Sequence, residues 1–127
     1  MKPNILFLFA DQHRHDILGC AGHPLVQTPN IDAIASEGVH FTKTWCQSPI
    51  CQPSRASVIT GRYAHEIGVT HNTGGFDPEW PTVMKQLQVA GYDTATIGKT
   101  HYHESYQPPK ADGEIDMRSK EGFVKSF

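Results

Sequence analysis

The sequence lacks long hydrophobic runs, and that lack excludes whole classes of protein. Its longest apolar run covers residues 5–10, whereas a membrane-spanning helix needs ~20 apolar residues. The charged stretch 11–16 follows that run without a small-residue cleavage site, so the N-terminus does not match a secretory signal. We therefore expect a cytoplasmic protein that does not span a membrane.

No charge sign predominates either. The 127 residues contain 11 Lys and Arg against 13 Asp and Glu, which gives a net charge of −2. Nothing in this balance favours a nucleic-acid backbone or an anionic membrane as a partner, so any bound anion must be held by local groups. The hydrophobic fraction of 38% is typical of a soluble globular domain and too high for a disordered tail.

Cysteine is scarce, and the three cysteines cannot all pair within one chain. Cys46 and Cys51 could form half of a zinc site, but a second cysteine pair is absent and their spacing is looser than usual. We interpret Cys20, between two small residues, as a structural thiol. At least one thiol is therefore free.

The order of apolar runs and helix signals predicts an α/β fold. Residues 4–10 are typical of a strand buried on both faces of a parallel sheet. Thr28 and Pro29 begin a helix that Gly38 ends, and residues 39–45 alternate like a half-exposed strand.

The second half of the chain continues this alternation of elements. A loop over residues 48–53 precedes a helix over residues 54–60 that Gly61 ends. Pro81 opens a helix with Val83, Leu87 and Ala90 on one face, and residues 92–97 form a strand. We predict a mostly parallel sheet with flanking helices over residues 1–105, followed over residues 106–127 by a polar linker or the start of an insertion.

Polar residues gather where the predicted strands end. Asp11 follows the first strand, Cys51 opens a helix after the second, and Lys99 and His101 follow the last. Ligands of open parallel sheets bind outside the carboxyl ends of the strands, so we expect these residues to meet at one rim.

Each of these residues has a functional and a structural interpretation. Asp11 with Gln12 offers oxygen ligands suited to Ca²⁺ or Mg²⁺, or the carboxylate caps the next turn. Cys51 beside Arg55 at a helix N-terminus favours a thiolate or a bound oxyanion, or it is a small buried side chain. The pair of residues 99 and 101 presents a cation and an acid–base group on one face of a continuing strand, or is a solvated strand end.

The sequence of residues 51–62, CQPSRASVITGR, resembles the type I sulfatase signature, Cys-x-Pro-Ser-Arg followed by a short helix and Thr-Gly-Arg. Other matching segments occur in the family's order: residues 3–6, 11–12, 19, 22–24, 28–32, 37–41, 90–94 and 97–101. The resemblance therefore extends from residue 3 to about residue 103.

This resemblance implies the N-terminal part of an alkaline-phosphatase-like sulfatase domain in which Cys51 is oxidised to Cα-formylglycine. One hydroxyl of the hydrated aldehyde would attack sulfur, and the other would expel sulfate by re-forming the aldehyde. It also implies a maturation partner that reads Pro53 and Ser54, either a formylglycine-generating enzyme or an anaerobic maturase.

The resemblance also implies roles for individual residues. Asp11, Gln12 and the modified Cys51 would bind a divalent metal, with Ca²⁺ preferred and Mg²⁺ the alternative. Arg55 would hold the formylglycine hydrate. Lys99 and His101 would contact the sulfate, and Asn72 would bind substrate.

The chain departs from the family pattern at Gln12, where many sulfatases have a second aspartate. An Asp-Gln pair also occurs in relatives similar to phosphonate monoester and phosphodiester hydrolases, and Asn72 falls where those enzymes place a substrate-binding Asn. Pro53 together with Lys99 and His101 favours a sulfatase. We therefore expect a sulfuric ester hydrolase; the alternatives are a phosphonate monoester or phosphodiester hydrolase and a non-catalytic, truncated relative that binds metal or oxyanion.

Members of this family are several times longer, and their remaining metal and sulfate ligands lie beyond this sequence. We therefore expect an N-terminal fragment that is inactive alone. A parallel sheet that is cut in mid-fold exposes an edge, which favours pairing with a missing C-terminal portion or self-association.

Overall fold

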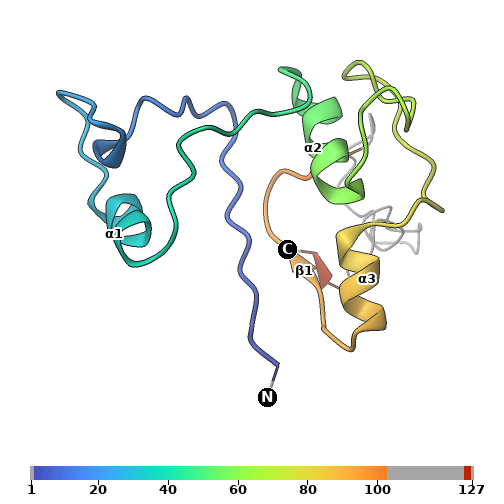
Figure 1. The fold of residues 1–127 in the computed structure, drawn as a ribbon. Helices are drawn as coiled ribbons and strands as arrows, with labels where there is room; N and C mark the ends of the chain where they lie inside the picture. The colour runs from blue at the N-terminus through green and yellow to red at the C-terminus, as the bar shows by residue number, and fades with distance from the viewer. Residues whose placement is uncertain (1, 103–124, 127) are drawn as a thin grey trace. The chain divides into compact units, whose positions relative to one another are not determined.

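The computed structural model describes residues 2–102 and 125–126, and the chain forms two units, Met1–Trp45 and Cys46–Phe127. The first unit contains the 3-10 helix η1 (Gly19–Ala21) and helix α1 (Pro29–Glu37). The second contains the helices α2 (Cys51–Thr60) and α3 (Val83–Val89) and the strands β1 (Ala95–Thr96) and β2 (Lys125–Ser126) (Figure 1).

Helix α1 confirms the bounds predicted from its end signals. Pro29 occupies its first turn, Thr28 precedes it, and the Gly38 amide donates to the Ile34 carbonyl at 3.0 Å. The Thr28 hydroxyl does not cap a helical amide. It accepts from the Gly19 amide at 2.8 Å and donates to the Asp32 carboxylate at 2.7 Å, so it ties η1 to α1.

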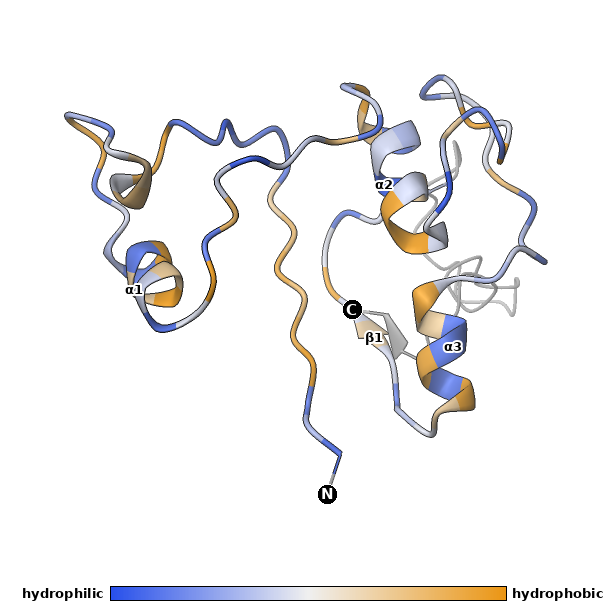
Figure 2. Ribbon diagram, in the orientation of Figure 1, coloured by the Kyte–Doolittle hydropathy of each residue, from blue (hydrophilic) through white to orange (hydrophobic). Residues whose placement is uncertain are grey.

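The strands predicted over residues 4–10 and 39–45 do not form. The structure assigns no strand to either segment, and apolar side chains in both are exposed, including Leu6 at 83% and Phe41 at 76%. Figure 2 shows the first segment as an extended hydrophobic stretch near the N-terminus. A strand exists only where a neighbouring strand completes its hydrogen-bond ladder, so apolar patterning alone does not produce one.

Helix α2 begins at Cys51, three residues earlier than predicted, so the prediction of a loop as far as Pro53 was wrong. Proline is tolerated there because an amide in the first helical turn has no acceptor within the helix. The predicted stop is confirmed, since Gly61 adopts φ 68° and its amide donates to the Ser57 carbonyl. Cys51 is therefore a helical residue.

Helix α3 begins after Thr82, whose hydroxyl accepts a hydrogen bond from the Lys85 amide at 3.3 Å. The predicted helix is confirmed, but its predicted inner face is wrong. Met84 is buried at 6% exposure, whereas Val83 is 50% exposed. The predicted start was also wrong, since Pro81 lies two residues before the helix begins.

The described sheet is parallel, as predicted. Strand β1 pairs with β2, with Ala95 opposite Lys125 and Thr96 opposite Ser126. The predicted strand over residues 92–97 is therefore shorter than expected, and β2 was not predicted. Of the predicted linker or insertion, residues 106–124 lie outside the described residues.

A hydrophobic core gives the second unit its own interior. Its buried members come from α2, α3 and the segments around them: Ala56, Ile59, Ile67, Val69, Phe76, Met84 and Tyr102, with Trp80 packed against them. Within the described part of the chain, no helix is long and apolar enough to cross a membrane. The core fixes α2, and α2 carries Cys51.

Candidate active site at the N-terminus of helix α2

Cys51 occupies the first turn of α2, where backbone amides point outward and favour a negatively charged group. The residue before it, Ile50, has no side-chain oxygen to cap those amides. Asn72 supplies one from another loop: its Oδ1 accepts from the Gln52 amide at 3.0 Å and from Cys51 Sγ at 3.4 Å. The predicted substrate-binding residue therefore lies directly beside the predicted nucleophile.

Gln52 is a site residue that the sequence analysis missed. Its side chain is completely buried, and Nε2 donates to the Gly74 carbonyl at 2.8 Å and to the Tyr102 carbonyl at 3.0 Å. It occupies the one unspecified position of the Cys-x-Pro-Ser-Arg pattern, so the motif gave no signal of its contacts. The structure shows that Gln52 joins three segments that are far apart in sequence.

Arg55 lies one helical turn after Cys51, and residues four apart share a helix face. Its side chain is only 5% exposed, and Nη1 donates to the Lys99 carbonyl at 2.9 Å. A buried guanidinium near the helix N-terminus adds fixed positive charge on the side of Cys51. The structure therefore brings two predicted catalytic residues, Arg55 and Lys99, into the same contact.

The segment after β1 does not continue as a strand. β1 ends at Thr96, Gly98 has φ 86°, and His101 has φ 53°, which is unusual for a residue other than glycine. Lys99 is nevertheless exposed and His101 half-buried, whereas Thr100 is buried. The strand geometry from which we predicted a shared face for residues 99 and 101 is therefore wrong, because this segment turns after β1 instead of continuing as a strand.

The predicted metal ligands Asp11 and Gln12 lie in the unit Met1–Trp45, and both are exposed. Gln12 adopts φ 40°, a left-handed conformation at the end of the extended N-terminal segment. Residues 2–102 and 125–126 contain no group of three or more His, Cys, Asp or Glu side chains arranged to hold a metal ion. Carboxylate and amide oxygens remain suited to a hard cation.

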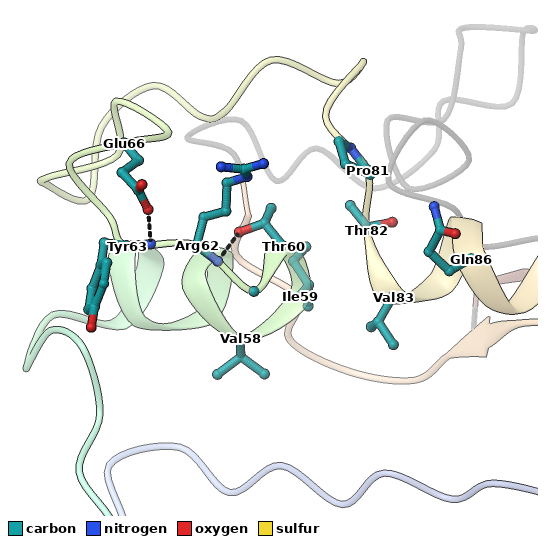
Figure 3. Close-up of a pocket in the computed structure, with 11 residues that line it drawn as sticks. Val58, Ile59, Thr60, Arg62, Tyr63, Glu66, Pro81, Thr82, Val83 and Gln86 are labelled. Atoms are coloured by element: carbon teal, nitrogen blue, oxygen red, sulfur yellow. Dashed lines mark hydrogen bonds between the residues drawn. The ribbon is translucent and has the colours of Figure 1, made fainter.

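A cavity of about 580 Å³ lies at the opposite end of α2 from Cys51 (Figure 3). Its walls come from the end of α2, the turn after it and the start of α3: Val58, Ile59, Thr60, Gly61, Arg62, Tyr63, Glu66, Pro81, Thr82, Val83 and Gln86. A ten-residue helix is ~15 Å long, so this cavity is separate from the Cys51 site.

The sequence of the chain is similar to that of known proteins. The family model for sulfatases matches residues 3–124 of the chain. The chain belongs to the sulfatase family. It is 44% identical over 100 residues to N-acetylglucosamine-6-O-sulfatase of Bacteroides thetaiotaomicron, an alignment that covers 79% of this chain and 18% of that protein. The chain spans about a fifth of the length of the curated sulfatases it matches.

Solved structures confirm the predicted α/β fold class for this sulfatase chain. A protein solved in complex with its substrate, D-glucosamine-2-N,6-O-disulfate, has a TM-score of 0.78 and 41% identity over 87% of this chain and 22% of that chain. A phosphonate monoester hydrolase of Agrobacterium radiobacter has a TM-score of 0.72 and 31% identity, covering 91% of this chain and 24% of that chain. The sulfatase signature of this chain, residues 51–62, covers α2 and the turn that follows it.

The other cysteines of the sulfatase chain have different surroundings. Burial and the neighbouring Asp32 carboxylate raise the pKa of the Cys20 thiol, so its thiolate is less populated than that of an ordinary cysteine. The Cys20 backbone amide donates to Asp32 at 2.8 Å. Cys46 is exposed, and all three cysteines are free. Of the three cysteines, Cys51 alone lies in the signature and in the first turn of an α-helix.

Proposed function

We propose that the protein carrying this chain hydrolyses sulfate esters of small molecules, with a formylglycine derived from Cys51 as nucleophile. Two hydrogen bonds of α2 support the proposal. Asn72 accepts from Cys51 at its start, and Arg55 binds the Lys99 carbonyl one turn later. Membership of the sulfatase family supports the ester class.

A formylglycine hydrate at position 51 would supply one hydroxyl that attacks sulfur and displaces the alcohol of the ester, and a second whose deprotonation re-forms the aldehyde and releases sulfate. The chain must present Cys51 to a maturation partner, either a formylglycine-generating enzyme or an anaerobic maturase. Cys51 is half-buried at the start of a helix. Its side chain is therefore held in place without being enclosed.

Charge on the chain's own residues favours a bound sulfate at this point. The amides of the first turn of α2 present partial positive charge at Cys51, and Arg55, one turn further on the same helix face, adds a fixed positive charge. Lys99 would neutralise charge on the transferring oxygens, and His101 would move a proton to or from the ester oxygen. Asn72, which already accepts from Cys51, would fix the orientation of the nucleophile and contact substrate.

We propose Asp11, Gln12 and modified Cys51 as ligands of a divalent metal, with Ca²⁺ preferred and Mg²⁺ the alternative. Their oxygens suit a hard cation, which would supply Lewis acidity at the ester when bound. Calorimetric titration of the whole protein with Ca²⁺ tests this assignment without measuring activity. Asp11→Asn should weaken the Ca²⁺ affinity at least tenfold, whereas an unchanged affinity would remove Asp11 from the ligand set.

A phosphonate monoester or phosphodiester hydrolase is the second candidate. It is favoured by the solved hydrolase at 31% identity, by Gln12 and by the position of Asn72. A relative that only binds metal or oxyanion is the third. Buried Arg55 and exposed Lys99 would serve either alternative, because each offers positive charge to an anion.

The substrate class is tested with the whole protein, purified with its maturation partner. Aryl sulfate, aryl phosphonate monoester and aryl phosphodiester should be compared as substrates for the unmodified sequence and for Cys51→Ala. We expect the aryl sulfate to have the highest kcat/KM, and Cys51→Ala to reduce it at least a thousandfold. Faster turnover of either phosphorus ester would establish the second candidate, and no turnover of any would establish the third.

A further inference from the structure

We propose that Gln52 is a positioning residue that fixes the segment of Lys99 and His101, together with the loop of Asn72, against the first turn of α2. The inference rests on the proposed function, because the residues that Gln52 positions are those assigned to the sulfate ester. Gln52 touches the backbone of both segments and does not itself contact the reacting atoms.

The hydrogen bonds of Gln52 define this role. Its Nε2 donates to the carbonyl of Gly74, two residues after Asn72, and to the carbonyl of Tyr102, the residue after His101. Its backbone amide donates to Asn72 Oδ1 at 3.0 Å. One residue beside Cys51 therefore holds both loops by three hydrogen bonds.

The segment 99–102 is anchored at both ends to the same helix. Arg55 binds the Lys99 carbonyl at 2.9 Å, and Gln52 binds the Tyr102 carbonyl at 3.0 Å. Lys99 and His101 lie between these two anchors. Within the described residues, β1 ends at Thr96 and His101 has a positive φ, so this segment does not have strand geometry.

The second amide atom of Gln52 separates a positioning role from simple packing. Two carbonyl acceptors require the NH₂ group on their side, which places Oε1 on the other side of the amide. Among the described residues, that buried oxygen has no hydrogen-bond partner. A buried acceptor without a partner lowers the stability of the folded protein. A side chain that only filled this space would be more favourable without the amide, so packing alone does not explain Gln52.

Gln52→Met tests the inference, because methionine keeps the length of the side chain and removes both donors. Steady-state kinetics with the aryl sulfate should be measured in the whole protein and expressed per formylglycine determined by peptide mass spectrometry. We expect kcat to fall about tenfold to a hundredfold, as misplaced catalytic groups do, with KM changed less than threefold. Gln86→Met, an exposed glutamine on α3, is the matched control and should leave kcat unchanged.

A double-mutant cycle with Lys99→Ala separates positioning from general destabilisation. If Gln52 acts through the segment of Lys99, Gln52→Met should lower kcat by a much smaller factor in the Lys99→Ala background than in the parent sequence. Full additivity of the two effects, or an unchanged kcat for a folded Gln52→Met, would overturn the inference.

A second variant keeps the test decisive if Gln52→Met does not fold. Gln52→Asn retains the amide but is one methylene too short to reach both carbonyls, so it should show the same kcat loss and the same cycle. If the parent is active and Gln52→Asn has the same kcat, the inference about Gln52 is refuted, while the proposed function still stands. A fully modified parent without turnover would refute the proposed function instead.

Discussion

The two units of this chain are stabilised by different interactions. In Cys46–Phe127, seven apolar residues are buried around α2, whereas no described residue of Met1–Trp45 is buried. The first unit is instead held by hydrogen bonds of Asp32 and Thr28 with the η1 backbone. The proposed nucleophile, Cys51, thus belongs to the unit with a core, whereas Asp11 and Gln12 belong to the unit without a described buried residue.

The missing strand partners explain why apolar residues of the first unit are exposed. Their patterning is that of strands, and strands are stable only beside other strands. The second unit needs no such partner for α2, because helices complete their backbone hydrogen bonds internally. The core of its own unit therefore fixes the helix that carries Cys51, whereas the segment that carries Asp11 has no buried residue.

The largest expected contrast between the units is in the cost of deleting an aromatic side chain. Phe76→Ala should lower the free energy of unfolding by about 3–5 kcal/mol, because Phe76 is 2% exposed in the core. Phe41→Ala should change it by less than about 0.5 kcal/mol, because Phe41 is 76% exposed. Urea unfolding of this chain measures both values: the fluorescence of Trp80 in a Trp45→Phe background reports Phe76→Ala, and that of Trp45 in a Trp80→Phe background reports Phe41→Ala. Equal costs would show that the first unit has a comparable core.

What the sequence predicted follows the same division. Helix ends were predictable because their signals are local: Pro29 and Gly38 for α1, and Gly61 for α2. Residues 4–10 were predicted as a strand from composition, yet whether a strand forms depends on residues far away in sequence. The rotation of α3 about its axis was also missed, because burial of Met84 is decided by packing and not by periodicity.

The candidate site was predictable in part. The signature predicted Cys51 and Arg55 as site residues, and the strand ends together with the wider resemblance predicted Lys99 and His101. Gln52 was not predicted, because its role depends on two backbone carbonyls that the sequence cannot place. The proline at position 53 indicated a loop, although the first turn of a helix accommodates it equally well.

The next largest expected effect is a loss of stability in the first unit when the contact between Gly19 and Asp32 is disturbed. A Cβ added at Gly19 would overlap the Asp32 carboxylate, so Gly19→Ala should destabilise the η1–α1 contact by about 1–3 kcal/mol. Hydrogen exchange of the α1 amides measures this loss. In an Asp32→Ala background the same substitution should cost little, since the overlapping carboxylate is gone. An equal cost in both backgrounds would place the strain of Gly19→Ala elsewhere.

The smallest expected effect is a pH dependence confined to the first unit. The Thr28 hydroxyl and then the Cys20 amide lower the pKa of Asp32 below its ordinary value of 3.8. The unfolded state therefore binds more protons in this range, so the stabilisation is present above pH ~4 and is lost as the pH falls through the folded pKa.

The Cys20 amide proton shift, followed by NMR between pH ~6 and ~2, reports this contact. Acidification should release it in the parent. Asp32→Asn keeps an oxygen acceptor but cannot titrate, so its Cys20 shift should stay flat over the same range. A transition of the same size in Asp32→Asn would mean that another group controls the contact.

Peptide mass spectrometry of Cys51 in the whole protein from its native host tests the central claim most directly. The account predicts an aldehyde or its hydrate at position 51, with Cys20 and Cys46 remaining thiols in the same sample. An unmodified thiol at Cys51 in active protein would contradict the formylglycine mechanism.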